Sequence, residues 1–382
     1  MPYSPFVSAN GSPLTLCEIE YSHLSQLLEI EEGYKVEYKS LWDNSLKRKH
    51  LAKTISSFAN TEGGWLFVGI EDDGNISPIE KGRTDFSQQI SMIVKTKISP
   101  FPAFETRFID CPHDAKKGVL VIHVREGVES PYICDGTIYI RIGSSKTPVK
   151  SSNRAEIDNL INKGEAFRRL VDGFCVDNVI NNESFPYCVI YLYSKYPSKH
   201  LDVASPNARD RIEPIAEKYR SKAWMPSTQS ILFYNAEAVS ESSYTTIIEQ
   251  FFNYNMKFYI PLTPLPNSLS VEVASIIKQK NPKTNIDGFT AIDGFLSYKI
   301  IAHTFDVALE MLSDNNITLE DYIIKWELKN VRNSYLYFAT KNNEWLNFIS
   351  EKNFRYSTKH DASGRLFALE ASNYTVQLTA CK

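Results

Sequence analysis

Residues 34–74 constrain the fold more than any other part of the chain, because their hydrophobic pattern changes period twice. Residues 34–41 alternate between apolar and charged side chains, which predicts a half-buried strand. Residues 47–60 carry Leu51, Ile55 and Phe58 at helical spacing, and Gly63-Gly64 supplies a helix stop. A second strand is predicted at 65–70 and a tight turn at 71–74. The segment therefore reads strand, helix, strand, turn.

The flanking patterns extend this segment into a mixed domain that closes near residue 170. Helices are predicted at 18–32, 86–97 and 154–163, and strands at 104–109, 118–124 and 137–141. The remainder, 171–382, alternates strand-like and helix-like runs. Its predicted strands are 187–193, 230–234, 257–261, 366–370 and 374–378, and its predicted helices are 209–222, 244–252, 269–279, 295–312 and a stretch around Trp326. We predict an α/β protein with an N-terminal α+β domain (1–170) and a C-terminal layered α/β domain (171–382).

Composition sets limits on function. A length of 382 residues, with 43% hydrophobic and 23% charged residues, is typical of a folded two-domain protein. The 42 basic and 45 acidic residues give a net charge of −3, so any nucleic-acid contact must come from a local basic patch. The six cysteines form no C-x-x-C pair and no apolar run is long enough to span a membrane, so we expect a reduced, cytoplasmic protein without a membrane partner.

Acidic residues around the first strand predict a metal-dependent phosphodiester site. Glu37 and Lys39 are two residues apart on a strand and share a face, so a carboxylate can hold a metal while an ammonium group lies beside the phosphate. Glu32 precedes this strand and Asp72 ends another, so three carboxylates from separate elements can converge. Oxygen ligands of this kind suit Mg²⁺ or Mn²⁺. Taken singly, the Glu37/Lys39 pair is also typical of a solvated pair or a cross-strand salt bridge, and the Asp72 segment is typical of a plain turn.

Two groups of residues are candidates for binding a nucleic-acid backbone. The first is Lys47, Arg48, Lys49 and Lys53 at the start of the 47–60 helix. The second is Arg141 and Lys146, which flank Gly143-Ser144-Ser145, where Ser144 and backbone N–H groups could meet a phosphate. A solvated helix start and an ordinary hairpin are the respective alternatives.

In combination these motifs resemble the Schlafen family, in its AlbA-like N-terminal core, over about residues 18–165. The residues that carry the resemblance are Glu32, Glu37-Tyr38-Lys39, Phe58-Ala59-Asn60-Thr61 with Gly63-Gly64, the 69–74 segment and the 139–145 segment. In nuclease-active members three acidic residues cut structured RNA such as tRNA, and the resemblance places them at Glu32, Glu37 and Asp72. Many related domains only bind nucleic acid. The animal enzymes use two such lobes, so the resemblance implies a homodimer for a chain with one.

We therefore predict a metal-dependent endoribonuclease for structured RNA, acting in antiphage defence or stress, with Glu32, Glu37, Lys39 and Asp72 as catalytic residues. The alternative is a non-catalytic DNA- or RNA-binding transcriptional regulator, in which the carboxylates only organise the fold. A third possibility is a scaffold whose first half dimerises. The C-terminal domain offers no comparable cluster, and we expect it to bind a small-molecule or protein trigger.

Overall fold

The computed structural model separates the chain into two compact units, Met1–Leu170 and Val171–Lys382. Both mix helices and strands, which confirms the α/β class. None of the described helices is both long and apolar enough to cross a membrane. The residues described are 3–44, 46–82, 85–176, 186–197, 206–217, 223–226, 229–234, 246–265, 267–280, 282, 290–313, 317, 319–331, 334–337 and 365–370.

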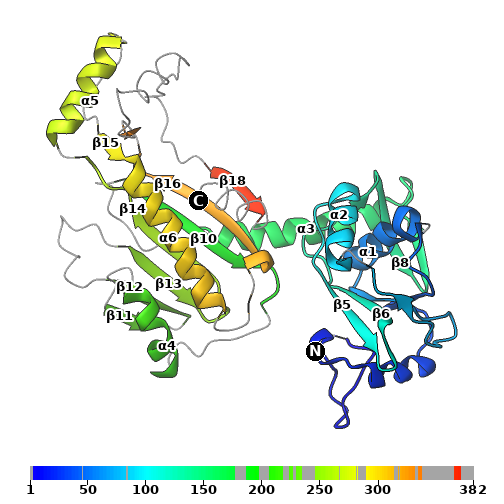
Figure 1. The fold of residues 1–382 in the computed structure, drawn as a ribbon. Coiled ribbons are helices and arrows are strands. Elements are labelled where there is room, and N and C mark those ends of the chain that lie inside the picture. Colours follow the sequence, from blue (N-terminus) through cyan, green and yellow to red (C-terminus); the bar gives the residue numbers. More distant parts are fainter. Residues whose placement is uncertain are drawn as a thin grey trace. The chain divides into compact units, whose positions relative to one another are not determined.

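The first unit contains two sheets (Figure 1). One is built from β1 (Val36–Lys39), β2 (Gly64–Val68), β3 (Ile79–Glu80), β5 (Phe104–Cys111) and β6 (Asp114–Val124). The other is built from β4 (Ile98–Ser99), β7 (Ile133–Cys134), β8 (Thr137–Ile142) and β9 (Ser145–Pro148). The helices are α1 (Leu51–Asn60), α2 (Phe86–Lys97) and α3 (Arg154–Phe174), preceded by 3₁₀ helices at Leu16–Glu18 and Tyr21–Glu29.

The apolar run that predicted β2 reflects burial on both faces of the first sheet. Leu66 and Val68 pack into a core with α1 and α2, whereas Trp65 and Phe67 pack into a second core with the N-terminal segment. A strand covered on both sides has no solvent face, and so its sequence does not alternate. β1 runs parallel to β2, with Glu37 opposite Leu66, which sets the direction of each β1 side chain.

Residues 18–32 were predicted as one helix, but the structure has the 3₁₀ helix Tyr21–Glu29 there. Three residues per turn place Leu24 and Leu27 on the same side, where both are buried, while Leu28 is 56% exposed. The Tyr38 hydroxyl donates to the Ile30 carbonyl at 2.7 Å and so ties this segment to β1. The helix predicted at 86–97 coincides with α2, and the 47–60 helix begins as a π-helical turn, Leu46–His50.

The second unit is a seven-stranded antiparallel sheet in the order β11-β12-β13-β14-β10-β16-β18, with a separate parallel pair, β15 and β17. Its core contains residues from α4 and α6, and Figure 1 shows α6 lying across one face of the sheet. The strands are β10 (Tyr187–Ser194), β11 (Ala223–Pro226), β12 (Ser230–Tyr234), β13 (Ile247–Phe251), β14 (Met256–Pro261), β15 (Thr290–Asp293), β16 (Tyr322–Lys329), β17 (Ser334–Tyr337) and β18 (Arg365–Glu370). The helices are α4 (Pro206–Glu217), α5 (Asn267–Lys280) and α6 (Gly294–Ser313).

Two of the predicted helices in this unit are wrong. The 244–252 segment contains β13, and the stretch around Trp326 is β16. Both are rich in β-branched and aromatic residues, which pack well on a pleated sheet, and both pair with strands on either side. The strand predicted at 366–370 is confirmed as β18, and 374–378 lies outside the described residues.

Candidate nucleic-acid site

The candidate site is centred on Glu37, whose carboxylate is 2% exposed. On β1, Val36 and Tyr38 point into the core shared with the N-terminal segment. Because successive side chains of a strand lie on opposite faces, Glu37 and Lys39 point the other way, toward α1. The prediction that these two share a polar face is confirmed, but the face is buried at Glu37. A carboxylate in such a place requires charged partners, since an unpaired buried charge is very costly.

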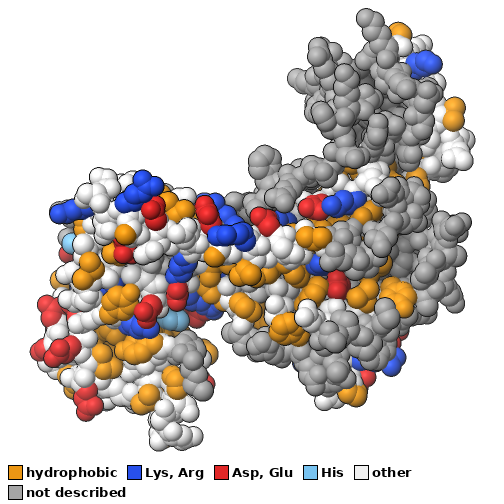
Figure 2. Space-filling view, turned by 180° about the vertical axis from the view of Figure 1, so that it is seen from behind, with side chains coloured by type: hydrophobic (Ala, Val, Ile, Leu, Met, Phe, Trp, Pro, Cys, Tyr) orange, Lys and Arg blue, Asp and Glu red, His pale blue; other side chains and the backbone are white. Residues whose placement is uncertain are grey.

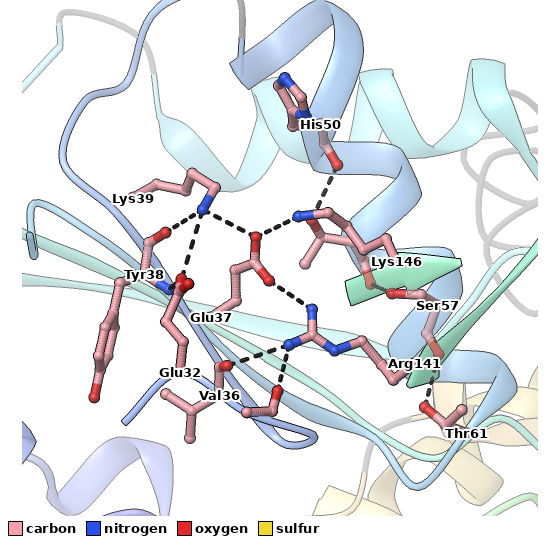
Figure 3. A network of polar contacts seen from close by, with 12 residues as sticks. Glu32, Val36, Glu37, Tyr38, Lys39, His50, Ser57, Thr61, Arg141 and Lys146 are labelled. Atoms are coloured by element: carbon pink, nitrogen blue, oxygen red, sulfur yellow. Dashed lines mark hydrogen bonds and ion pairs between the residues drawn. The ribbon is translucent and has the colours of Figure 1, made fainter. Parts of the chain in front are cut away.

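The β8–β9 hairpin supplies those partners. Arg141 and Lys146 are opposite each other in the hairpin register, and both reach Glu37 (Figure 3). Arg141 Nη1 donates to Glu37 Oε2 at 2.5 Å, and Lys146 Nζ donates to Oε1. Arg141 Nη2 also donates to the carbonyls of Gly33 and Val36, so the guanidinium binds the backbone at the start of β1.

Lys39 links Glu37 to the other predicted acid. Its Nζ lies 2.9 Å from Glu37 Oε1 and 3.6 Å from Glu32 Oε1. Glu32 in turn accepts a hydrogen bond from the Tyr38 backbone N–H at 2.5 Å. We call Glu32, Glu37, Lys39, Arg141 and Lys146 the Glu37 cluster. The structure thus brings together five of the predicted site residues.

The charge balance of this cluster keeps Glu37 ionised. Burial raises the pKa of the carboxyl group, but Lys146, Arg141 and Lys39 outweigh it and lower the pKa from 4.5 to about 2. The cluster contains three cationic and two acidic side chains, and the ammonium of Lys53 lies close enough to influence the same surroundings. Counting Lys53, the balance is 4 − 2 = +2.

Asp72 does not join Glu32 and Glu37. It is exposed in the turn after β2, where Glu71 N donates to the Asn75 carbonyl at 2.9 Å. Among the described residues, no group of three or more His, Cys, Asp or Glu side chains is placed to hold a metal ion. The Glu37 oxygens already accept from three cationic groups, which would also repel a divalent cation. The side chains as arranged do not fit Mg²⁺ or Mn²⁺.

Arg141 was predicted to contact a phosphate, but its side chain is fully buried and engaged with Glu37. Gly143, with φ of +59°, and Ser144 form the two-residue turn of an ordinary hairpin. Ser144 is exposed at its tip, and Lys146 is the residue of this group that combines a contact to Glu37 with partial exposure, 18%.

The comparisons with known proteins concern this part of the chain. The model of the family described as Schlafen, AlbA_2 matches residues 32–150, which include the whole Glu37 cluster. We call residues 32–150, which match this family, the AlbA_2 domain. The match supports a nucleic-acid-related function for the AlbA_2 domain.

The other two comparisons add no functional detail. Among curated proteins, none is significantly similar to the chain. A crystal structure of the DIP2311 protein from Corynebacterium diphtheriae is similar over 49% of this chain and 29% of that one, with 21% sequence identity and a TM-score of 0.25. The chain therefore spans less than a third of that protein's length.

The Phe58–Gly64 motif of the AlbA_2 domain packs against Arg141 of the Glu37 cluster. The Arg141 guanidinium lies 4.7 Å from the centre of the Phe58 ring, and the ring packs directly against Gly64, where a methyl group would overlap it. A glycine at 64 therefore allows the ring to sit beneath the arginine. Motif residues that gave no chemical role in the sequence thus position the charged pair.

Asn60 is a further structural residue of this motif, and sequence reasoning missed its role. Its Nδ2 donates to the carbonyls of Tyr132 at 2.8 Å and Tyr139 at 2.9 Å, and its Oδ1 accepts from Tyr132 N at 2.7 Å. The side chain is buried and joins the end of α1 to the second sheet. Its place in the Phe58–Gly64 motif, directly before the helix stop, was the available signal.

The remaining basic candidates lie around the start of α1. Lys53 Nζ lies 5.3 Å from the centre of the Tyr139 ring, and Lys47 Nζ lies 5.0 Å from that of Trp42. The side chains of Arg48 and Lys49 are outside the described part of the structure. On the face drawn in Figure 2, the described Lys and Arg side chains are interspersed with Asp and Glu, as the net charge predicts. A binding site must therefore rely on local clustering.

Proposed function

We propose that the AlbA_2 domain binds the phosphate backbone of nucleic acid through Lys39, Lys53 and Lys146, held around the buried Glu37. The observation that supports this most is the partial exposure of cations that outnumber the acids beside them: the Lys39 side chain is 28% exposed and that of Lys146 is 18%. Glu37 fixes the positions of two of these ammonium groups without neutralising the whole set. Such prepositioned cations contact phosphates without reading base sequence.

Salt dependence tests this proposal. We expect the full chain to bind tRNA, single-stranded RNA or duplex DNA with an affinity that falls as salt rises, because each neutralised phosphate releases counterions. Lys53→Ala should lower the slope of log K against log salt by about 0.7–0.9. Lys53 is the suitable position because its ammonium lies over Tyr139 and its loss leaves Glu37 with all three partners.

Lys117→Ala is the matched control, since Lys117 is an exposed lysine of the same domain at the far end of β6. Fluorescence anisotropy at four or more salt concentrations gives both slopes. Equal slopes for wild type, Lys53→Ala and Lys117→Ala would show that nucleic acid does not contact this surface.

RNA cleavage is a second candidate, and the observation in its favour is that Lys39 lies within 3.6 Å of Glu32 and within 2.9 Å of Glu37. If it is correct, the full chain will cut tRNA into discrete fragments, and Glu32→Gln will slow cutting by about a hundredfold or more. Gln retains an acceptor for the Tyr38 N–H, so this variant should keep the fold. If tRNA stays intact with the wild-type protein, cleavage is wrong and only the binding proposal remains.

The homodimer and the trigger of the C-terminal unit are further parts of this proposal. A second copy would bring a second Glu37 cluster to one nucleic acid. Light scattering of the full chain, alone and with bound tRNA, measures the mass directly. A monomer in both states would remove the dimer from the proposal without affecting the salt test.

A further inference from the structure

His50 is an exposed imidazole next to the proposed phosphate-binding lysines. It is the last residue of the Leu46–His50 turn and lies one helical turn before Lys53 and Thr54. Its backbone carbonyl accepts a hydrogen bond from Thr54 Oγ1 at 3.0 Å, which fixes the backbone here (Figure 3). Among the described residues, the ring itself has no hydrogen-bond partner, so its nitrogens are available to a ligand.

The charged groups that face His50 come from three elements. They are Lys39 and Glu37 of β1, Lys53 of α1, and Lys146 of β9. Partial burial and the three ammonium groups lower the pKa of His50 below its usual 6.5, and the Glu37 carboxylate opposes them. Without a ligand the ring is therefore neutral at pH 7. A phosphate bound among the lysines would add negative charge and favour the protonated ring.

We propose that His50 is a phosphate ligand of the nucleic-acid site and takes up one proton from solvent when a phosphate group binds beside Lys53 and Lys146. This inference rests on the proposed function. Protonated imidazole donates through both ring nitrogens, so a phosphate oxygen can accept a charge-assisted hydrogen bond from it. Because binding and proton uptake are linked, the affinity must increase as the pH falls.

The test measures the affinity of the full chain for a labelled oligouridylate between pH 8.0 and 5.5 at constant ionic strength. Uracil does not titrate in this range, so the RNA contributes no pH dependence of its own. We expect wild type to bind about tenfold more tightly at pH 5.5, the change that corresponds to a shift of one pKa unit on binding. His50→Gln should be nearly independent of pH, and His50→Arg should bind tightly throughout the range.

His113→Gln is the matched control, because His113 is an exposed histidine of the same unit in the turn between β5 and β6. It should retain the wild-type profile. If His50→Gln retains the wild-type pH profile, His50 is not the linked group and the inference is wrong, although salt-dependent binding would still support the proposed function. If wild type fails to bind RNA at any pH and low salt, the proposed function itself fails.

Discussion

Replacing Glu37 by alanine is expected to lower the free energy of unfolding of the first unit by about 3–5 kcal/mol. The variant leaves Arg141 buried without its carboxylate and removes the shared partner of Lys39 and Lys146. The loss of one member of a buried pair costs more than the pair contributes, because the remaining charge cannot be solvated. Hydrogen exchange of β2 and β6 amides in the full chain measures this change without interference from the second unit.

The pH dependence of the same pair gives a separate check. The pKa of Glu37 is depressed from 4.5 to about 2 in the folded protein, so its stabilisation is fully present above pH 4.5 and is lost as the pH falls from there toward 2. The stability advantage of wild type over Glu37→Gln should therefore shrink by about 3 kcal/mol across this window. Comparison with Glu37→Gln cancels the contributions of other carboxyl groups.

A matched acid of the same domain serves as the control for both measurements. Glu80→Ala removes an exposed carboxylate at the end of β3 and should change stability by no more than about 0.5 kcal/mol. If Glu37→Ala is as stable as Glu80→Ala, or if the wild-type advantage is constant from pH 5 to 2, then Glu37 is not the charged centre of this site.

Asn60→Ala is expected to lower the stability of the first unit by about 3 kcal/mol. It leaves the Tyr132 N–H and the carbonyls of Tyr132 and Tyr139 without the amide that satisfies them, and each unsatisfied buried group costs about 1–3 kcal/mol. The Ser56 hydroxyl also donates to the Tyr132 carbonyl at 3.0 Å, so the loss at that atom is partial.

Asn162→Ala is the control for this variant, because Asn162 is exposed on α3. It should be neutral or slightly stabilising, since alanine is the better helix former. The same exchange measurement applies, with β8 amides as the most direct probe. Retained protection of β8 in Asn60→Ala would show that the second sheet is held to α1 by other contacts.

The local elements of the first unit could be predicted because their patterns have a local cause. Alternation at β1, the two-sided apolar run of β2 and the start and end of α2 follow from side-chain period and helix-stop residues. The strand around Trp326 has the same kind of local cause, because Ile324, Trp326 and Leu328 alternate with Lys325, Glu327 and Lys329. The helix predicted there overlooked this alternation.

The residues of the Glu37 cluster could be predicted from the sequence, but the contacts between them could not. Glu37 and Arg141 are 104 residues apart, and no spacing rule joins a strand to a hairpin at that distance. From the sequence we predicted that the acidic residues bind a metal ion and that the basic residues bind a phosphate. It could not anticipate that Arg141 turns inward to Glu37, because the direction of that side chain is decided by the hairpin register and by the Phe58 ring beneath it.

The contact between the β8–β9 hairpin and β1 determines where the AlbA_2 domain can be truncated. A fragment that ends before the hairpin would retain β1, α1 and β2, but it would lack Arg141 and Lys146 and would leave Glu37 to Lys39 alone. The β8–β9 hairpin is thus joined to β1 through ion pairs and not through strand pairing, because the hairpin and β1 belong to different sheets. During synthesis, Glu37 must therefore remain without two of its partners until residue 146 has left the ribosome.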